Sequence, residues 1–188
     1  GVWVSRVVGG VRGVYGAGCV LRVRQCQMCT GDGSTSAVVL GARATASSAL
    51  AALGELGIVT STVAARRFGG PGSVVPASSR LGVSIEQVLW SDRGAVLRAV
   101  SGADLVISTL PAGVADPLAE HMTVREGQIL LDVVYSPRET ALRSAFERNG
   151  GIVAEGTDML IYQAAAQVQL MTGRSPKTDV MRGALEAE

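Results

Sequence analysis

The alternation of short apolar runs with helical patterns from Ser36 onward most limits how this chain folds. The runs that predict strands are 37–40, 61–65, 83–89, 104–108, 129–134 and 152–154. Helices are predicted at 45–56, 93–100, 139–149, 157–171 and 178–187, most of them ending near a glycine. Strands that alternate with helices in this way favour an α/β fold, built on a doubly wound parallel sheet with helices at the C-terminal end.

The composition excludes several classes of protein. Of the 188 residues, 47% are hydrophobic, and the net charge is only +1. This charge gives no electrostatic reason to expect a nucleic-acid partner. No apolar stretch approaches the roughly 18 residues that span a bilayer, and residues 1–30 lack the pattern of a signal peptide. We therefore expect a cytoplasmic protein without a nucleic-acid or membrane partner.

The N-terminal segment 1–34 differs from the rest of the chain. It carries several arginines but no acidic residue before Asp32, and its apolar residues follow no clear period. We expect an atypical segment here, disordered or not native, followed by one domain over residues 35–188. Cys26 and Cys29 have a C-x-x-C spacing, but a zinc site needs a second ligand pair. A redox motif needs a strand before it and a helix after it, so we predict no metal site.

A candidate phosphate-binding turn lies between the first strand and the first helix. Dinucleotide-binding turns follow the pattern G-x-G-x-x-G or G-x-G-x-x-A, which places the pyrophosphate at the N-terminus of a helix. Gly41 and Ala46 match the first and last positions, but Arg43 stands where the middle glycine belongs. That glycine lets the backbone approach the phosphates. An arginine there either crowds the phosphates or offers them a positive charge, and both interpretations stay open.

Arg66 and Arg67 follow the second predicted strand. In an NAD-binding fold this place usually holds an acidic residue, which binds the ribose hydroxyls. A basic residue suits a 2′-phosphate instead, and hence NADP. The alternative is a pair of solvated charges on a loop.

Three later segments resemble the shikimate dehydrogenase family, and the resemblance runs from about residue 36 to 185. The segments are 108–113 (STLPAG), 132–137 (DVVYSP) and 156–164 (GTDMLIYQA). The resemblance implies a Rossmann-like NADP-binding domain with C-terminal helices. It also implies an oxidoreductase of aromatic amino-acid biosynthesis (the chorismate pathway), which interconverts 3-dehydroshikimate and shikimate with NADP as cofactor.

The resemblance further implies roles for individual residues. Arg66 matches the basic residue for the adenosine 2′-phosphate, and Thr109 would lie beside the cofactor's ribose region. The phosphate loop would be formed by Gly41, Ala42, Arg43, Ala44 and Thr45, although the family normally has glycine at positions 43 and 44. The residues near the nicotinamide would be Val133, Gly156 and Met159, and those that reach shikimate would be Tyr135 and Gln163.

The family's catalytic Lys and Asp belong to an N-terminal substrate domain, and their motifs do not appear in this sequence. Its single lysine, Lys177, lies near the C-terminus. We therefore assign no catalytic residue and expect a family member that lacks this domain. Two alternatives stay open: a catalytically inactive dinucleotide-binding module or remnant, and an α/β domain whose Arg43 blocks the turn. Without the substrate domain, we expect the chain to self-associate through an apolar face of the last helices, formed by Leu160, Ala164, Val168 and Met171.

Overall fold

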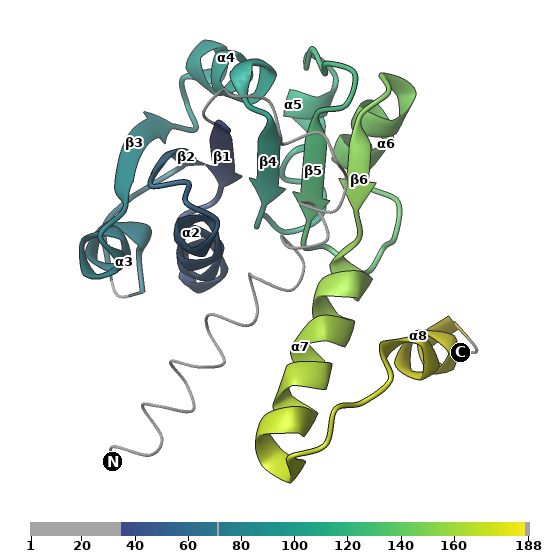
Figure 1. Ribbon diagram of the computed structural model, residues 1–188. Coiled ribbons are helices and arrows are strands. Elements are labelled where there is room, and N and C mark those ends of the chain that lie inside the picture. The colour runs from purple at the N-terminus through teal and green to yellow at the C-terminus, as the bar shows by residue number, and fades with distance from the viewer. Residues whose placement is uncertain (1–34, 71, 187–188) are drawn as a thin grey trace.

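The computed structural model describes residues 35–70 and 72–186, which form one six-stranded sheet and the helices around it (Figure 1). The strand order is β3-β2-β1-β4-β5-β6, and every neighbouring pair is parallel. The strands are β1 (Ala37–Leu40), β2 (Thr60–Ala65), β3 (Ser84–Leu89), β4 (Leu105–Ser108), β5 (Ile129–Asp132) and β6 (Ile152–Ala154). The predicted doubly wound parallel sheet is confirmed. The predictions on residues 1–34, including the cysteines, lie outside the described residues.

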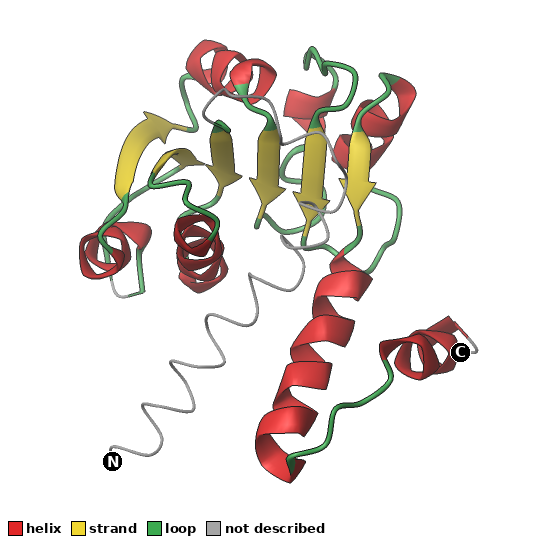
Figure 2. Ribbon diagram, in the orientation of Figure 1, coloured by secondary structure: helices red, strands yellow, loops and turns green. Residues whose placement is uncertain are grey.

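Helices cover both faces of the sheet (Figure 2). One core cluster joins β1, β2, β4 and β5 to α2 (Ala44–Glu55) and α3 (Val74–Leu81). The second joins the other face to α4 (Arg93–Gly102), α5 (Asp116–Ala119) and α6 (Ala141–Arg148). The last two helices are α7 (Gly156–Thr172) and α8 (Thr178–Glu186). Figure 1 shows α7 leaving the end of β6 and pointing away from the sheet.

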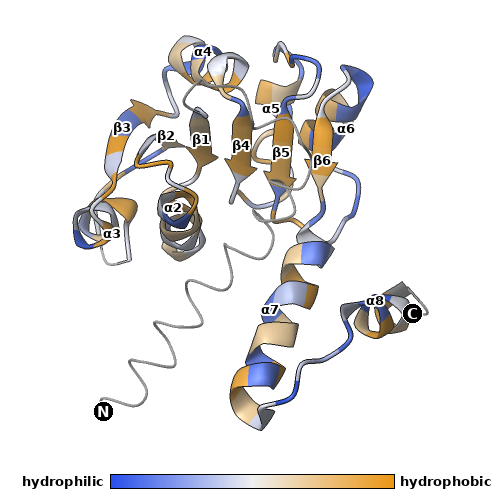
Figure 3. Cartoon of the chain, in the orientation of Figure 1, coloured by the Kyte–Doolittle hydropathy of each residue, from blue (hydrophilic) through white to orange (hydrophobic). Residues whose placement is uncertain are grey.

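The core follows from the two-residue period of buried strands. In β1, Ala37 and Val39 contact the α2 side, whereas Val38 and Leu40 contact the α4 side. Both faces of a central parallel strand are covered by helices, so such a strand is apolar throughout. Figure 3 shows this as hydrophobic colour along the central strands. On the α6 side, Phe146 is completely buried. Packing against helices on both faces therefore accounts for the short, continuous apolar runs.

The structure corrects three details of the predicted elements. The fifth strand ends at Asp132 rather than at residue 134, because the Asp132 carboxylate accepts a hydrogen bond from the Val134 N–H and turns the chain. The helix predicted from residue 157 begins one residue earlier, at Gly156. Two helices were not predicted: α3, and the short helix α5, which begins with Asp116 and Pro117.

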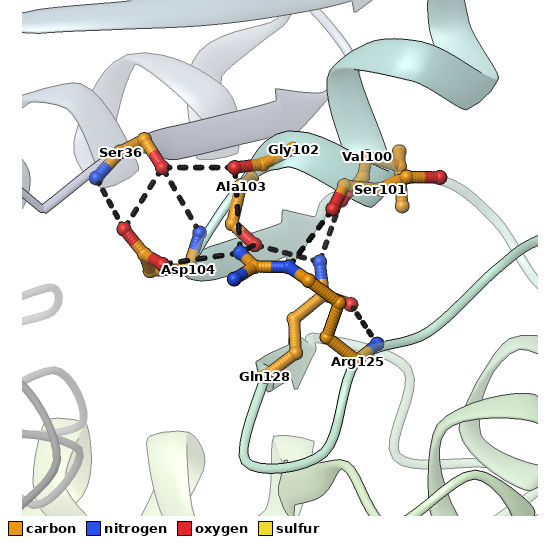
Figure 4. Close-up of polar contacts among 8 residues, drawn as sticks. All are labelled: Ser36, Val100, Ser101, Gly102, Ala103, Asp104, Arg125 and Gln128. Atoms are coloured by element: carbon orange, nitrogen blue, oxygen red, sulfur yellow. Dashed lines mark hydrogen bonds and ion pairs between the residues drawn. The ribbon is translucent and has the colours of Figure 1, made fainter.

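A polar cluster closes the edge of the sheet where the strands begin (Figure 4). Buried Gln128 donates to the carbonyl oxygens of Val100 and Ala103 at the end of α4, at 2.5 and 2.7 Å. Arg125 donates to the Ala103 carbonyl at 2.8 Å and pairs with Asp104 at 3.1 Å. The cluster satisfies the last carbonyls of α4, which have no partner within the helix.

The same cluster fixes the start of the sheet. Burial raises the pKa of Asp104, but hydrogen bonds from Ser36 and Arg125 outweigh this effect and hold that pKa below its ordinary value.

In the described part of the chain, no helix is long and apolar enough to cross a membrane. The same residues contain no group of His, Cys, Asp or Glu side chains that could hold a metal ion.

Candidate functional site

The order of the strands marks the edge where a ligand would bind. β1 and β4 are neighbours, yet the chain leaves β1 toward α2 on one face and β4 toward α5 on the other. In open parallel sheets, ligands bind beyond the carboxyl ends of the strands at such a switch point. The carboxyl ends of β1 and β4 carry Gly41 and Thr109, two of the residues expected to bind a cofactor.

The turn after β1 requires a glycine. Gly41 has φ +112°, a backbone conformation that residues other than glycine rarely adopt. A Cβ there would also collide with the Thr109 hydroxyl oxygen. The Thr109 N–H and hydroxyl both donate to the Leu40 carbonyl at 2.8 Å. The Gly41 N–H donates to the Ala64 carbonyl of β2 at 2.8 Å. The turn is thus held between β2 and β4, at the centre of the sheet's carboxyl edge.

The N-terminus of α2 is open to an anion. Arg43 is its N-cap residue, with extended backbone angles and no capping hydrogen bond from its side chain, and the first turn contains no acidic residue. The N–H groups of the first helical residues, Ala44 and Thr45 among them, point outward from the helix end, as they do in any α-helix. Together with the helix dipole, they favour a negatively charged group.

The loop after β2 lies against this turn. The Val74 N–H, at the start of α3, donates to the Ala42 carbonyl at 3.2 Å. Arg66 is exposed directly after β2. The Arg43 side chain reaches Gly70 in the same loop, with Nη1 3.9 Å from where a Cβ on that glycine would stand. The structure therefore brings Arg43 to the loop that carries Arg66.

The two C-terminal motif segments meet through their backbones. A Cβ on Gly156 would lie 2.7 Å from the Val133 carbonyl oxygen and 2.8 Å from that of Val134. The absence of a side chain therefore lets α7 start directly against the loop after β5. Met159, one turn into α7, packs against the core cluster on the α2 side. The loop after β5, Gly156 and the first turn of α7 therefore lie together.

The residues expected to reach a substrate lie on the two segments that form this contact. Tyr135 lies in the loop after β5 and is 57% exposed. Gln163 is half-buried on α7, one turn after Met159, so the two share one face of the helix. Both lie at the β5–α7 end of the site, whereas Arg66 lies at the β2 end, with β1 and β4 between them in the sheet.

Sequence reasoning did not assign a role to the buried carboxylate of Asp132. Asp132 is 5% exposed. Its carboxylate accepts hydrogen bonds from the Thr140 hydroxyl at 2.8 Å and from the Val134 N–H at 3.2 Å. Burial raises its pKa, and the hydrogen bonds from Thr140 and Val134 offset this only in part. Thr140 also caps α6, since its oxygen accepts the Arg143 N–H at 3.1 Å. Asp132 thus joins the loop after β5 to the start of α6.

A second polar link joins α6 to α7. The Arg143 side chain pairs with Glu155 at 2.9 Å and with Glu147 at 2.8 Å. Glu155 is the N-cap residue of α7 and also accepts the Thr157 hydroxyl at 3.0 Å. Burial raises the pKa of Glu155, but Arg143 and Thr157 outweigh burial and hold it below its ordinary value. The start of α7 is therefore fixed from two sides.

These links leave only weak signals in the sequence. A threonine before an apolar helical pattern is a usual N-cap, and this could have placed the start of α6 at Ala141 rather than at Glu139. Nothing in the spacing pairs Arg143 with Glu155, because the two residues lie on different elements. The carboxylate of Asp132 could have been noticed as a charge at the end of an otherwise apolar strand.

The chain is similar to known proteins both in sequence and in fold. Residues 156–186 match the model of the family described as Shikimate 5'-dehydrogenase C-terminal domain. The chain is 34% identical to the shikimate dehydrogenase (NADP(+)) of Moorella thermoacetica over 150 residues, which are 77% of this chain and 50% of that protein. It is 37% identical to the same-named protein of Methanothermobacter thermautotrophicus over 92 residues, 46% of this chain and 32% of that protein.

The fold agrees with these matches. The crystal structure of Mycobacterium tuberculosis shikimate dehydrogenase superposes with a TM-score of 0.77 and 32% identity, over 95% of this chain and 62% of that one. The chain spans half or less of the length of the curated relatives named above. The matched segment 156–186 includes Gly156, Met159 and Gln163, which the sequence motifs had singled out. By fold and by sequence, the chain belongs to the shikimate dehydrogenase family.

Proposed function

We propose that this chain binds NADP(H) across the carboxyl edge of its sheet. The observation that carries the proposal is the arrangement around the switch point, where Gly41, Thr109 and the open N-terminus of α2 meet. The pyrophosphate would lie on the N–H groups of the loop Gly41–Thr45. Arg66 is exposed after β2 and supports NADP over NAD. A cation at this position attracts the negatively charged 2′-phosphate, which NAD lacks. The relatives' names, which include NADP(+), support the same cofactor.

The nicotinamide would lie at the other end of the edge, beside Val133, Gly156 and Met159. Gly156 packs on the Val133 backbone without a side chain between them, which supports a flat surface against which a ring can stack. Gln163, which is half-buried, and Tyr135, which is exposed, are the polar side chains that we expect next to it. These groups support binding of a polyhydroxylated ring acid, shikimate or 3-dehydroshikimate.

The reaction we propose is the NADP-dependent interconversion of 3-dehydroshikimate and shikimate. Hydride chemistry is supplied by the cofactor when it is bound, and the protein orients it. In this chain, the residues of the β5–α7 end would orient the nicotinamide and hold one side of the substrate. Proton exchange at the substrate oxygen needs a positioned acid–base group. Lys177 is exposed in the loop before α8, so we assign it no such role.

The second candidate is a dinucleotide-binding module without turnover. The observation that favours it is the lack of a positioned lysine beside the proposed nicotinamide face among the described residues, since the chain's single lysine is Lys177. This candidate shares the cofactor site with the first. The dehydrogenase and the binding module therefore both predict NADPH binding, and only the dehydrogenase predicts turnover.

Two assays test the proposal. In the first, NADPH fluorescence is titrated with the protein. Saturable binding supports both candidates, and no binding at millimolar cofactor would exclude them. In the second, the protein is incubated with 3-dehydroshikimate and NADPH. Oxidation of NADPH that depends on 3-dehydroshikimate supports the dehydrogenase, and binding without turnover supports the module. The cytoplasmic location, the absence of a nucleic-acid partner and self-association stay predictions.

A further inference from the structure

We propose that Arg43 is a specificity-determining residue, whose guanidinium contacts the 2′-phosphate of NADP(H) together with Arg66. This inference rests on the proposed cofactor site and goes beyond it. Sequence alone left two interpretations of an arginine in the phosphate loop, namely crowding of the pyrophosphate or attraction of a phosphate. The placement of the side chain favours the second.

The Arg43 side chain reaches from the start of α2 to the loop after β2. Its φ of −104° and ψ of −165° are extended rather than helical, and a guanidinium, which only donates hydrogen bonds, cannot cap the N–H groups of α2. The guanidinium instead ends at Gly70, 3.9 Å from the position of a Cβ on that glycine. Gly70 has φ +99° and no side chain, so the loop leaves space for the arginine. The charge therefore lies at the loop after β2.

This loop is where the adenosine ribose would lie. In doubly wound dinucleotide folds, the residue at the end of the second strand contacts the ribose 2′ position. Here Arg66 occupies that position and is exposed. The hydrogen bond from Val74 N–H to the Ala42 carbonyl holds the loop against the phosphate turn. Arg43 therefore approaches the 2′ position from the side of the turn, and Arg66 from the side of β2.

The positive charges around the expected 2′-phosphate position are not neutralised by ion pairs within the described residues. Among residues 35–70 and 72–186, no ion pair involves Arg43, Arg66 or Arg67. Glu86 on β3 accepts the Thr62 hydroxyl and Asp92 caps α4, and neither carboxylate forms an ion pair with these arginines. Uncompensated guanidiniums are suited to a phosphate dianion, which they bind with two parallel hydrogen bonds. NAD(H) lacks this phosphate, so the expected effect is a preference between the two cofactors.

The test compares NADPH and NADH affinities of the wild-type chain with those of Arg43→Gln and Arg43→Gly. The first variant removes the charge and keeps much of the bulk. The second restores the fingerprint glycine, and glycine is tolerated at an N-cap. Arg148→Gln is the matched control, because Arg148 is also exposed but lies at the end of α6. Circular dichroism of each variant establishes that it is folded.

We expect both Arg43 variants to weaken NADPH binding about tenfold or more, since hydrogen bonds to charged groups carry that much affinity. NADH affinity should stay unchanged, and the NADPH loss should shrink at high salt. Tighter binding of both cofactors by Arg43→Gly would mean crowding and would overturn the proposal. Equal losses for both cofactors, or no change for either, would also overturn it. Should the wild-type chain bind neither cofactor, the proposed function itself fails, and this result is distinguishable from the others.

Discussion

Replacement of Gly156 by alanine tests the contact that joins the two C-terminal motifs. The new Cβ would lie 2.7 Å from the Val133 carbonyl oxygen, 2.8 Å from the Val133 carbonyl carbon and 2.8 Å from the Val134 carbonyl oxygen. All three are backbone atoms, so no side-chain rotation can relieve the contact. Either α7 moves outward or the loop after β5 shifts.

The free energy of unfolding should fall by about 1–2 kcal/mol. Overpacking of a tight site costs about 1–3 kcal/mol. The gain in helix propensity, at most about 1 kcal/mol for glycine to alanine, is smaller at the first helical residue. The measurement is urea denaturation followed by circular dichroism. The same shift should weaken NADPH binding, because the nicotinamide surface that we propose is formed by this contact.

The matched control is Gly102→Ala at the end of α4. Its backbone does not have a positive φ, and among the described residues no atom outside its chain neighbours and its own helix backbone lies within 4 Å of a Cβ there. This variant should be as stable as the wild type, or up to about 1 kcal/mol more stable. Equal stabilities of the Gly156→Ala and Gly102→Ala variants would refute the close approach of α7 to Val133.

Two further predictions concern buried polar groups. Gln128→Leu removes two buried hydrogen bonds to the end of α4 and should cost about 2 kcal/mol in urea denaturation; exposed Gln87→Leu is the control, and a loss no larger than in this control would contradict the role of the cluster. The pKa of Asp132 is raised in the folded chain, so the folded state keeps its proton to higher pH than the unfolded state. Stability from this group therefore falls as pH rises from the ordinary value of 3.8 through the raised pKa. Asp132→Asn should gain stability relative to the wild type over this rise, and a difference that is independent of pH would rule out the raised pKa.

Much of the fold follows from local patterns in the sequence. β1 and β6 were predicted with their observed bounds, because a continuous apolar run between glycines or polar residues is typical of a buried parallel strand. The start of α6 was placed two residues early, at Glu139, because its cap depends on the Thr140 hydroxyl. The four-residue helix α5 is too short to show a helical period.

The parts of the candidate site that lie within sequence motifs could be predicted from the sequence. The segments around Val133 and Gly156 were expected to converge, and their backbones do. The pairing of Arg143 with Glu155 could not be predicted, since it joins residues on two different elements. The direction of the Arg43 side chain depends on its extended backbone and on the space over Gly70. Neither can be read from the motif.

The cofactor site at the carboxyl edge of the sheet is tested most directly by titrating isotope-labelled protein with NADP⁺. The amide chemical shifts are measured at each step. We expect changes that begin at Gly41–Thr45, Arg66 and Thr109, and that extend to Val133 and Gly156. These residues lie along the carboxyl edge of the sheet, whereas Gln128 lies at the opposite edge and should not change. Changes centred on Gln128 and its neighbours, or no changes at millimolar NADP⁺, would contradict a cofactor site at the switch point.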